Sequence, residues 1–219
     1  MDFEKARFNM VEQQIRPWDV LDGKILDLLF HVKREDFVAA DKRTLAFTDM
    51  ELPLENGALM LQPKVEARLV QELQLKPSDR VLEVGTGSGY VTALLASLAS
   101  HVYSLDIDGS QLARAAARLK QAGLRNITLT EGNGINGLPQ QAPFDAIFVG
   151  GSLPLVPETL KHQLAIGGRM VIIVGDEPVM RAQLIERLSE DTYSELVIFD
   201  TLTARLQGSE AIEPERFEF

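Results

Sequence analysis

The chain has 219 residues, 45% of them hydrophobic and 25% charged, and a formal net charge of −10. This composition is typical of a globular chain with one large core, and no apolar run approaches the roughly 18 residues that a membrane-spanning helix needs, so we expect no membrane partner. The acidic balance argues against nucleic acid as the main partner, because phosphate binding depends on clustered Lys and Arg.

The first third of the chain is expected to be mainly helical. Apolar residues recur at helical intervals over residues 3–16 and 20–31, and Pro17 separates the two predicted helices. Residues 32–62 show little periodicity and are expected to form a long connection or lid, since irregular segments of this length are usually functional. A helix is predicted over residues 64–73.

From Arg80 onward, predicted strands and helices alternate. Strands are predicted at residues 81–84, 101–105, 127–129, 144–149 and 168–174, with helices beginning near residues 90 and 109 and at 158–164. Continuous apolar strands separated by helices predict an α/β fold with a doubly wound, mostly parallel sheet.

The last part of the chain is predicted to contain a helix near residues 178–189 and two consecutive strands, 193–200 and 201–206. These strands bring the sheet to seven and would form an antiparallel edge. One catalytic domain with an N-terminal extension is therefore expected. Residues 1–76 form an N-terminal helical extension and lid, packed on a Rossmann-like domain of residues 77–219.

A glycine-dense turn follows the first strand of the predicted sheet. Its members are Gly85, Thr86, Gly87, Ser88 and Gly89. Glycine lets the backbone pass close to a ligand because it has no Cβ, and the N–H groups at the start of the next helix point toward that ligand. Tyr90 stands where a dinucleotide-binding motif has its third glycine, so the spacing differs from that motif.

Asp106 ends the second strand, about 20 residues after Gly85. Ligands of open α/β sheets bind beyond the carboxyl ends of the strands, where an acid at this distance binds ribose hydroxyls. Asp106, with Ile107 beside it, is therefore our ribose-binding candidate. The alternative is that Asp106, or equally Asp108, only caps the helix beginning near Gly109.

Two further features belong to the same edge of the sheet. Glu83 precedes the glycine turn and either contacts the ligand or holds the loop. Residues 150–152, Gly-Gly-Ser, follow the fourth strand and are expected to line the pocket. The alternating glycines with an acid before them resemble the first motif of class I S-adenosylmethionine-dependent methyltransferases. S-adenosylmethionine is therefore the expected cofactor.

Several blocks spread over residues 10–175 resemble the protein-L-isoaspartate O-methyltransferase family. They are residues 10–15, 34–38, 49 with 52–53, 62–63, 85–89 and 143–145. The resemblance implies methylation of the free carboxylate of isoaspartyl residues in damaged proteins or peptides, which begins their repair. It also implies that the glycine turn contacts the methionine part of the cofactor, Asp106 the ribose, and Gly132, Asn133 and Gly134 the adenine.

The segment before Gln62 departs from the family pattern. The family usually has Gln-Thr-Ile-Ser there, whereas this chain has Ala58, Leu59, Met60 and Leu61. Leucine cannot donate the hydrogen bond that the family's serine offers to a carboxylate. Leu59, Leu61 and Gln62 are the substrate-site candidates, and the alternative is that the aliphatic residues face the core.

Three hypotheses follow for the activity. The first is an isoaspartyl carboxyl methyltransferase, which needs no general base because a carboxylate is already ionised at neutral pH. The second is a related methyltransferase with a less polar acceptor, supported by the aliphatic segment. The third is a protein that binds the cofactor without catalysis.

The remaining polar residues suggest little chemistry. The chain has no cysteine, and its three histidines lack ligand spacing, so no metal site is expected. The absence of cysteine and of a secretory signal favours a cytoplasmic location. Arg114, Arg118, Lys120 and Arg125 gather around one predicted helix and are expected to form its solvated face. The acidic end of the chain, residues 210–219, either packs back on the domain or recruits a partner, and the oligomeric state is not readable.

Overall fold

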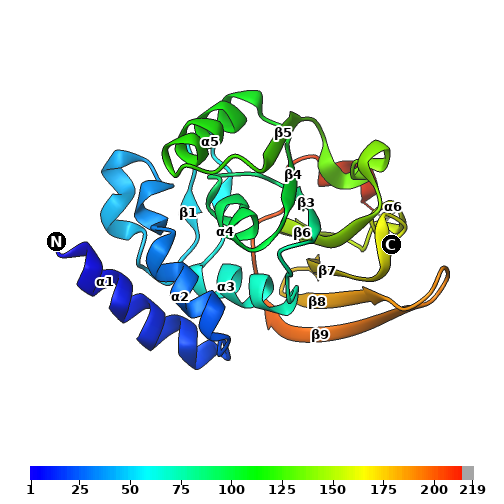
Figure 1. The fold of residues 1–219 in the computed structure, drawn as a ribbon, viewed down its shortest axis with the longest axis horizontal. Coiled ribbons are helices and arrows are strands. Elements are labelled where there is room, and N and C mark those ends of the chain that lie inside the picture. The colour runs from blue at the N-terminus through cyan, green and yellow to red at the C-terminus, as the bar shows by residue number, and fades with distance from the viewer. Residues whose placement is uncertain (214–219) are drawn as a thin grey trace, which may run out of the picture.

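The computed structural model describes residues 1–213, and residues 214–219, most of the acidic C-terminal segment, lie outside the described part. A single seven-stranded sheet forms the centre of the molecule, in the order β5-β4-β3-β6-β7-β8-β9 (Figure 1). The five strands from β5 to β7 are parallel, and β8 and β9 add antiparallel pairs at one edge. The predicted α/β class, with seven strands, an antiparallel edge and N-terminal helices, is therefore confirmed.

The boundaries of the elements are as follows. The helices are α1 Phe3–Met10, α2 Gly23–His31, α3 Pro63–Glu72, α4 Tyr90–Leu98, α5 Gly109–Gln121 and α6 Glu158–Lys161. The strands are β1 Leu52–Pro53, β2 Leu59–Met60, β3 Arg80–Val84, β4 His101–Asp106, β5 Ile127–Glu131, β6 Phe144–Leu153, β7 Leu164–Asp176, β8 Val179–Arg187 and β9 Tyr193–Thr201. Short 3₁₀ turns connect several of them.

The sheet separates two apolar clusters because successive side chains of a strand point to opposite faces. On β3, Val81 belongs to the cluster beneath α3, α4 and the N-terminal helices, whereas Leu82 and Val84 belong to the cluster beneath α6. Both faces of β3 and β6 are buried, which explains their continuous apolar sequence. The carboxyl ends of β3, β4 and β6 consequently meet at one edge of the core.

The predicted helix over residues 178–189 is wrong, because this segment is strand β8. Its Met, Ala, Gln, Leu and Glu residues are good helix formers, so local propensity favoured a helix. Met180 and Ala182 are nevertheless buried on alternate positions, and the segment pairs with β7 on one side and β9 on the other. Pairing on both sides outweighs the local preference.

The predicted strand over residues 201–206 is also wrong. β9 ends at Thr201, and the chain then crosses back over the carboxyl end of β6, where only Ser152 and Arg205 form an isolated bridge. The antiparallel edge that the sequence predicts exists, and the predicted strand over residues 193–200 is β9, but its antiparallel partner is β8 instead of residues 201–206.

The N-terminal extension packs on the sheet through α3 and α4. The first predicted helix is continuous to residue 18 but changes from α-helical to π-helical over Val11–Ile15, and α2 begins at Gly23. Residues 32–62 form 3₁₀ turns and the small hairpin β1–β2 in place of longer elements. The sequence predicts this irregularity correctly.

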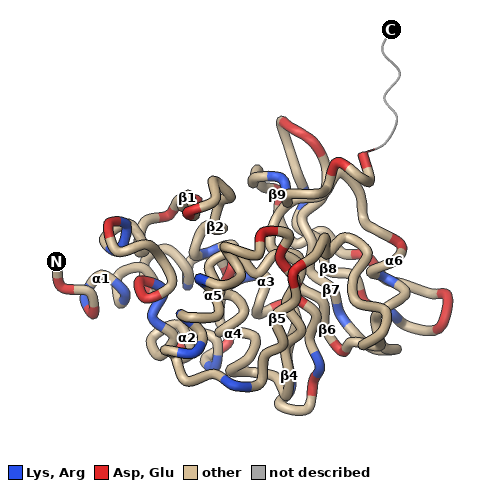
Figure 2. Tube along the Cα trace, turned by 90° about the horizontal axis from the view of Figure 1, so that it is seen from above, with Lys and Arg blue, Asp and Glu red and all other residues tan. Residues whose placement is uncertain are grey.

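Charged residues are distributed over many elements. Figure 2 shows Lys and Arg on several helices and strands with Asp and Glu among them, and the whole sequence carries ten more acidic than basic charges. None of the helices within residues 1–213 has the length and hydropathy of a membrane span.

Candidate active site

A cavity of about 640 Å³, open solvent at its mouth included, lies at the carboxyl ends of β3 and β4. Val84 and Leu105, the last apolar residues of these strands, form part of its floor together with Gly150 and Gly151 of β6. Two distant segments form the remaining wall, namely residues 54–61 of the β1–β2 hairpin and residues 203–207 after β9.

The glycine turn has a backbone conformation that side chains disfavour. Gly85, Gly87 and Gly89 have φ angles of +90°, +51° and +85°. The N–H groups of Gly85 and Thr86 both donate to the carbonyl oxygen of Leu105, at 2.8 and 3.1 Å, which fixes the turn to the end of β4. The turn is therefore held open toward the cavity by its own hydrogen bonds.

Asp106 and Asp108 have separate roles. The carboxylate of Asp106 lines the cavity and accepts hydrogen bonds from the N–H groups of Gly87, at 2.8 Å, and Asp108, at 3.0 Å. Asp108 caps α5 by accepting from the N–H groups of Ser110 and Gln111. The hydrogen bond from the Ser110 hydroxyl, followed by those from Gln111 and Asn56, lowers the pKa of Asp108 to about 2. The helix cap is thus Asp108, and Asp106 faces the cavity.

Glu83 lies behind the glycine turn. Its side chain is fully buried and accepts hydrogen bonds from the hydroxyls of Thr92, at 2.6 Å, and Ser104. Burial raises the pKa of Glu83 to about 8, although both hydrogen bonds act in the opposite direction. The side chain joins β3, β4 and α4 and is not among the residues that line the cavity, so it acts on the glycine turn only through its neighbours.

A second cavity, of about 320 Å³ with open solvent included, adjoins the first at Gly85 and Gly87. Thr86 and Ser88 line it on the side of the glycine turn, and Glu66 of α3 lines it on the other side. Glu66 is 2% exposed and accepts a hydrogen bond from Nε of Arg34 at 2.9 Å. Burial raises the pKa of Glu66 to about 7, and the charge of Arg34 opposes this rise.

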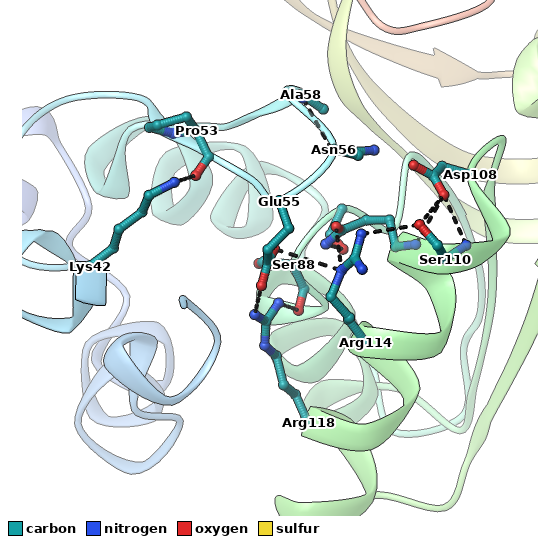
Figure 3. A network of polar contacts seen from close by, with 12 residues as sticks. Lys42, Pro53, Glu55, Asn56, Ala58, Ser88, Asp108, Ser110, Arg114 and Arg118 are labelled. Atoms are coloured by element: carbon teal, nitrogen blue, oxygen red, sulfur yellow. Dashed lines mark hydrogen bonds and ion pairs between the residues drawn. The ribbon is translucent and has the colours of Figure 1, made fainter. Parts of the chain in front are cut away.

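The hairpin β1–β2 forms a lid that is attached to α5. Glu55, at its tip, accepts a hydrogen bond from Arg118 and lies 4.0 Å from Arg114 (Figure 3). Asn56 follows Glu55 and helps to lower the pKa of the nearby Asp108. The prediction that these arginines form only a solvated face is therefore wrong for Arg114 and Arg118, since both contact the lid.

The segment after β9 closes the opposite side of the cavity. The hydroxyl of Ser152 donates to the carbonyl oxygens of Thr203 and Ala204, both at 3.1 Å, and the N–H of Leu206 donates to the carbonyl oxygen of Ser152 at 2.9 Å. The hydroxyl of Thr203 donates to the carboxylate of Glu51, which precedes the lid hairpin. The lid and the C-terminal segment are thus joined directly.

The structure brings most of the predicted site residues together. The first cavity is lined by Leu59, Leu61, Gly85, Gly87, Asp106, Ile107, Gly132 and Gly134. Thr86 and Ser88 line the second cavity, together with Leu59, Leu61, Gly85 and Gly87. Gln62, Glu83, Gly89 and Asn133 line neither: Gln62 precedes α3, Gly89 precedes α4, and Asn133 caps a 3₁₀ turn.

Sequence reasoning missed the lining residues of the C-terminal segment and Glu66. The sequence predicts a strand for the residues after β9, and Glu66 lies in a helix whose polar residues otherwise resemble a solvated face. Of residues 150–152, Gly150 and Gly151 line the cavity as expected, whereas Ser152 is buried and lines neither cavity, and all three lie within β6 instead of after it. No group of His, Cys, Asp and Glu within residues 1–213 is arranged to hold a metal ion.

The two cavities fit an elongated ligand with a polar group at each end. At one end, Asp106 offers a carboxylate beside Gly132, where an added Cβ would meet no atom within 4 Å. At the other end lie the first turn of α4 and Glu66. A nucleoside joined to an amino acid has this distribution of polar groups. The sheet order, the glycine turn after β3 and the acid at the end of β4 define an S-adenosylmethionine-dependent methyltransferase of class I.

The comparisons place the chain within that class. The family model for protein-L-isoaspartate(D-aspartate) O-methyltransferase matches residues 5–207. The chain is 37% identical to the protein-L-isoaspartate O-methyltransferase of Koribacter versatilis over 214 residues, which cover 98% of this chain and 96% of the relative. The chain belongs to the protein-L-isoaspartate O-methyltransferase family and is an S-adenosylmethionine-dependent enzyme of that type.

Solved structures show the same fold. A protein-L-isoaspartate O-methyltransferase superposes with a TM-score of 0.80 at 24% identity, over 94% of this chain and 66% of the other. The Plasmodium falciparum beta-aspartate methyltransferase, in complex with S-adenosyl-L-homocysteine, superposes with a TM-score of 0.76 at 20% identity, over 94% of this chain and 99% of the other. Because both sequence identities are below 25%, these superpositions show a shared fold only.

Proposed function

We propose that this chain transfers a methyl group from S-adenosylmethionine to the carboxylate of isoaspartyl residues in damaged proteins and peptides. The observation that carries the proposal is the match to the family over residues 5–207, which includes the glycine turn, the lid and the C-terminal segment that together enclose the cavity.

The residues around the first cavity supply the cofactor contacts. Asp106 binds the ribose hydroxyls, because its carboxylate lines the cavity at the end of β4. Gly132 and Gly134 bound the adenine end, and Gly85 and Gly87 leave the backbone exposed toward the methionine end. Glu83, Gly89 and Asn133 support these residues from behind, and when bound the cofactor supplies the electrophilic methyl group.

Positioning is the main contribution of this site to the reaction. A carboxylate acceptor is ionised at neutral pH, so the reaction needs no general base. Leu54, Leu59 and Leu61 line the wall beside the glycine turn, where they exclude water and strengthen electrostatic interactions within the site. Alignment of the two reacting groups is worth several kcal/mol, on the order of 7–11 in well-oriented cases.

The test is transfer of labelled methyl from S-adenosylmethionine to an isoaspartyl peptide, with the matching aspartyl peptide as control. We expect transfer to the isoaspartyl peptide alone. Leu61→Ser adds a hydroxyl at the cavity wall and is expected to raise the rate, by as much as roughly 10²-fold if the hydroxyl reaches the reacting carboxylate. Leu196→Ser, an exposed position on β9, is the matched control and should change nothing.

Two results would contradict the proposal. Equal labelling of both peptides would show that the isoaspartyl group is not recognised. No labelling of either peptide by the wild-type chain or Leu61→Ser, at cofactor concentrations that saturate the protein, would point to another acceptor.

The same proposal includes the wider setting of the enzyme. The substrates are proteins or peptides, and the net charge of −10 supports neither nucleic acid nor an anionic membrane as a partner. The absence of cysteine supports a cytoplasmic location. Residues 1–76 act as the helical extension and lid of the cofactor-binding domain at 77–219.

A further inference from the structure

Glu66 is a buried acid for which the transfer reaction described above has no use. It lies on α3 and lines the second cavity, whereas Asp106 lines only the first. Of the described residues that line this cavity, Glu66 alone has an ionisable side chain, and the others contribute apolar groups, hydroxyls and backbone. A charge in such surroundings is costly unless it has a partner.

Arg34 holds Glu66 in place but leaves part of its carboxylate available. The guanidinium of Arg34 is fully buried and donates to Oε2 of Glu66 at 2.9 Å, to the carbonyl oxygen of Ala46 at 2.8 Å and to that of Leu61 at 2.6 Å. Its donors are therefore shared between the acid and two backbone carbonyls, one before and one after the lid hairpin. The remaining oxygen, Oε1, accepts no hydrogen bond from the residues that the structure describes.

The chemistry of the second cavity suits a zwitterion. Ser88 and Val91 at the start of α4 line one side, where the free N–H groups and the dipole of a helix N-terminus favour an anion. Glu66 offers a carboxylate to a cation on another side. An α-amino acid carries both charges on one carbon atom, and the two cavities adjoin at Gly85 and Gly87, so one ligand can occupy both.

We propose that Glu66 binds the α-ammonium group of the cofactor's methionine moiety, with Arg34 as the positioning residue behind it. This inference rests on the proposed function, because it requires S-adenosylmethionine as the ligand. The acceptor of that reaction is itself a carboxylate, which Glu66 would repel. Glu66 therefore belongs to the cofactor side of the site. Glu83, the acid of the glycine motif, is turned away and engaged by Thr92 and Ser104.

The test compares two ligands by calorimetry, without any methyl transfer. S-adenosyl-L-homocysteine carries the ammonium group, whereas 5′-methylthioadenosine has the same nucleoside and sulfur but no amino acid. Glu66→Gln keeps the size of the side chain and an oxygen that can accept from Arg34. We expect this variant to bind S-adenosyl-L-homocysteine about 10- to 100-fold more weakly, as expected for loss of a charged hydrogen bond. Its affinity for 5′-methylthioadenosine should be unchanged.

Glu35→Gln is the matched control. Glu35 is an equally buried acid that is paired with Arg7 and lines neither cavity, so its amide should leave both affinities unchanged. Thermal unfolding of each variant shows whether it is folded, and Glu66→Asp, which retains the charge but shortens the side chain, provides a second variant with an intermediate loss.

Equal weakening for both ligands, or no weakening for either, would overturn this inference alone. If the wild-type chain bound neither ligand, the proposed function would fail as well. A normal affinity of Glu66→Gln for S-adenosyl-L-homocysteine, together with a raised KM for the isoaspartyl peptide, would place Glu66 on the acceptor side and would also contradict the inference.

Discussion

Leu206 covers Gly85. A Cβ atom added to Gly85 would lie 2.7 Å from Cδ1 of Leu206, and the φ angle of this glycine is +90°. The first glycine of the turn and the segment after β9 are therefore fitted to each other across the cavity. Neither residue can be enlarged without moving the other.

We expect Gly85→Ala to abolish measurable binding of S-adenosyl-L-homocysteine while the chain remains folded. The left-handed conformation costs a side chain about 1–2 kcal/mol, and the methyl group displaces Leu206 from the cavity wall. Gly123→Ala is the control, since Gly123 has a φ angle of +77° but no atom within 4 Å of the added Cβ. If Gly85→Ala and Gly123→Ala lost the same stability and the same affinity, the glycine turn would have no special role in binding.

Asp106→Asn is expected to weaken the binding of S-adenosyl-L-homocysteine by about 10- to 100-fold, because a charged hydrogen-bond acceptor for the ribose is lost. The neighbouring Asp108→Asn should bind normally, since asparagine is also a good helix cap. Isothermal titration calorimetry of both variants decides the matter. The reverse pattern, with Asp108 the more sensitive, would show that the cap orients the ligand and that Asp106 does not.

The ion pair between Glu55 and Arg118 is expected to control how long the lid stays closed. Exposed ion pairs contribute at most about 1 kcal/mol, so Glu55→Gln should change the free energy of unfolding little. The dissociation rate of S-adenosyl-L-homocysteine, measured by stopped flow, should rise by roughly 3- to 5-fold, and more at low salt than at high salt. Arg118→Gln should give the same dissociation rate as Glu55→Gln. The variant with both substitutions should show no further increase.

Arg125→Gln serves as the control for that experiment, because Arg125 is exposed beyond the end of α5. An additive effect of the Glu55 and Arg118 substitutions would contradict a shared contact.

The buried Glu83 should make the chain less stable as the pH rises. Its pKa is about 8 in the folded chain against 4.5 as the ordinary value, so the folded state holds the proton more tightly. The contribution of Glu83 to the free energy of unfolding is greatest below pH 4.5 and is lost as the pH rises through about 8. The size of this pKa shift limits the contribution of Glu83 to about 5 kcal/mol at most.

Chemical denaturation at several pH values tests this expectation. The difference in unfolding free energy between wild type and Glu83→Gln should decrease from pH 5 to pH 8. Asp108→Asn is the control, because the pKa of Asp108 is lowered to about 2 and its contribution is constant over this range. A difference that increases with pH would mean that Glu83 is ionised in the folded chain.

The parallel part of the sheet could be predicted because its strands are buried on both faces and read as continuous apolar runs. β3 and β6 are examples. β8 could not be predicted, because pairing with two neighbours, and not local propensity, decides its conformation. Its alternation is also short, since a register shift interrupts it between Ala182 and Gln183.

The cofactor side of the site was readable because its spacing is local. Gly85 to Asp106 spans one strand-helix-strand unit, and the chemistry follows from that spacing. The lid contacts were not readable, because Arg118 and Glu55 are 63 residues apart and nothing in either neighbourhood indicates the other. The position of Glu66 in a cavity likewise depends on how α3 packs, which periodicity alone does not determine.

The hydrogen bond between Thr203 and Glu51 joins residues 152 positions apart. During synthesis, the glycine turn and the floor of the cavity can form once β6 has left the ribosome, whereas its roof also needs residues 203–207, which are made only after β9. A nascent chain that has folded its sheet as far as β7 therefore has the glycine turn but cannot yet enclose a ligand.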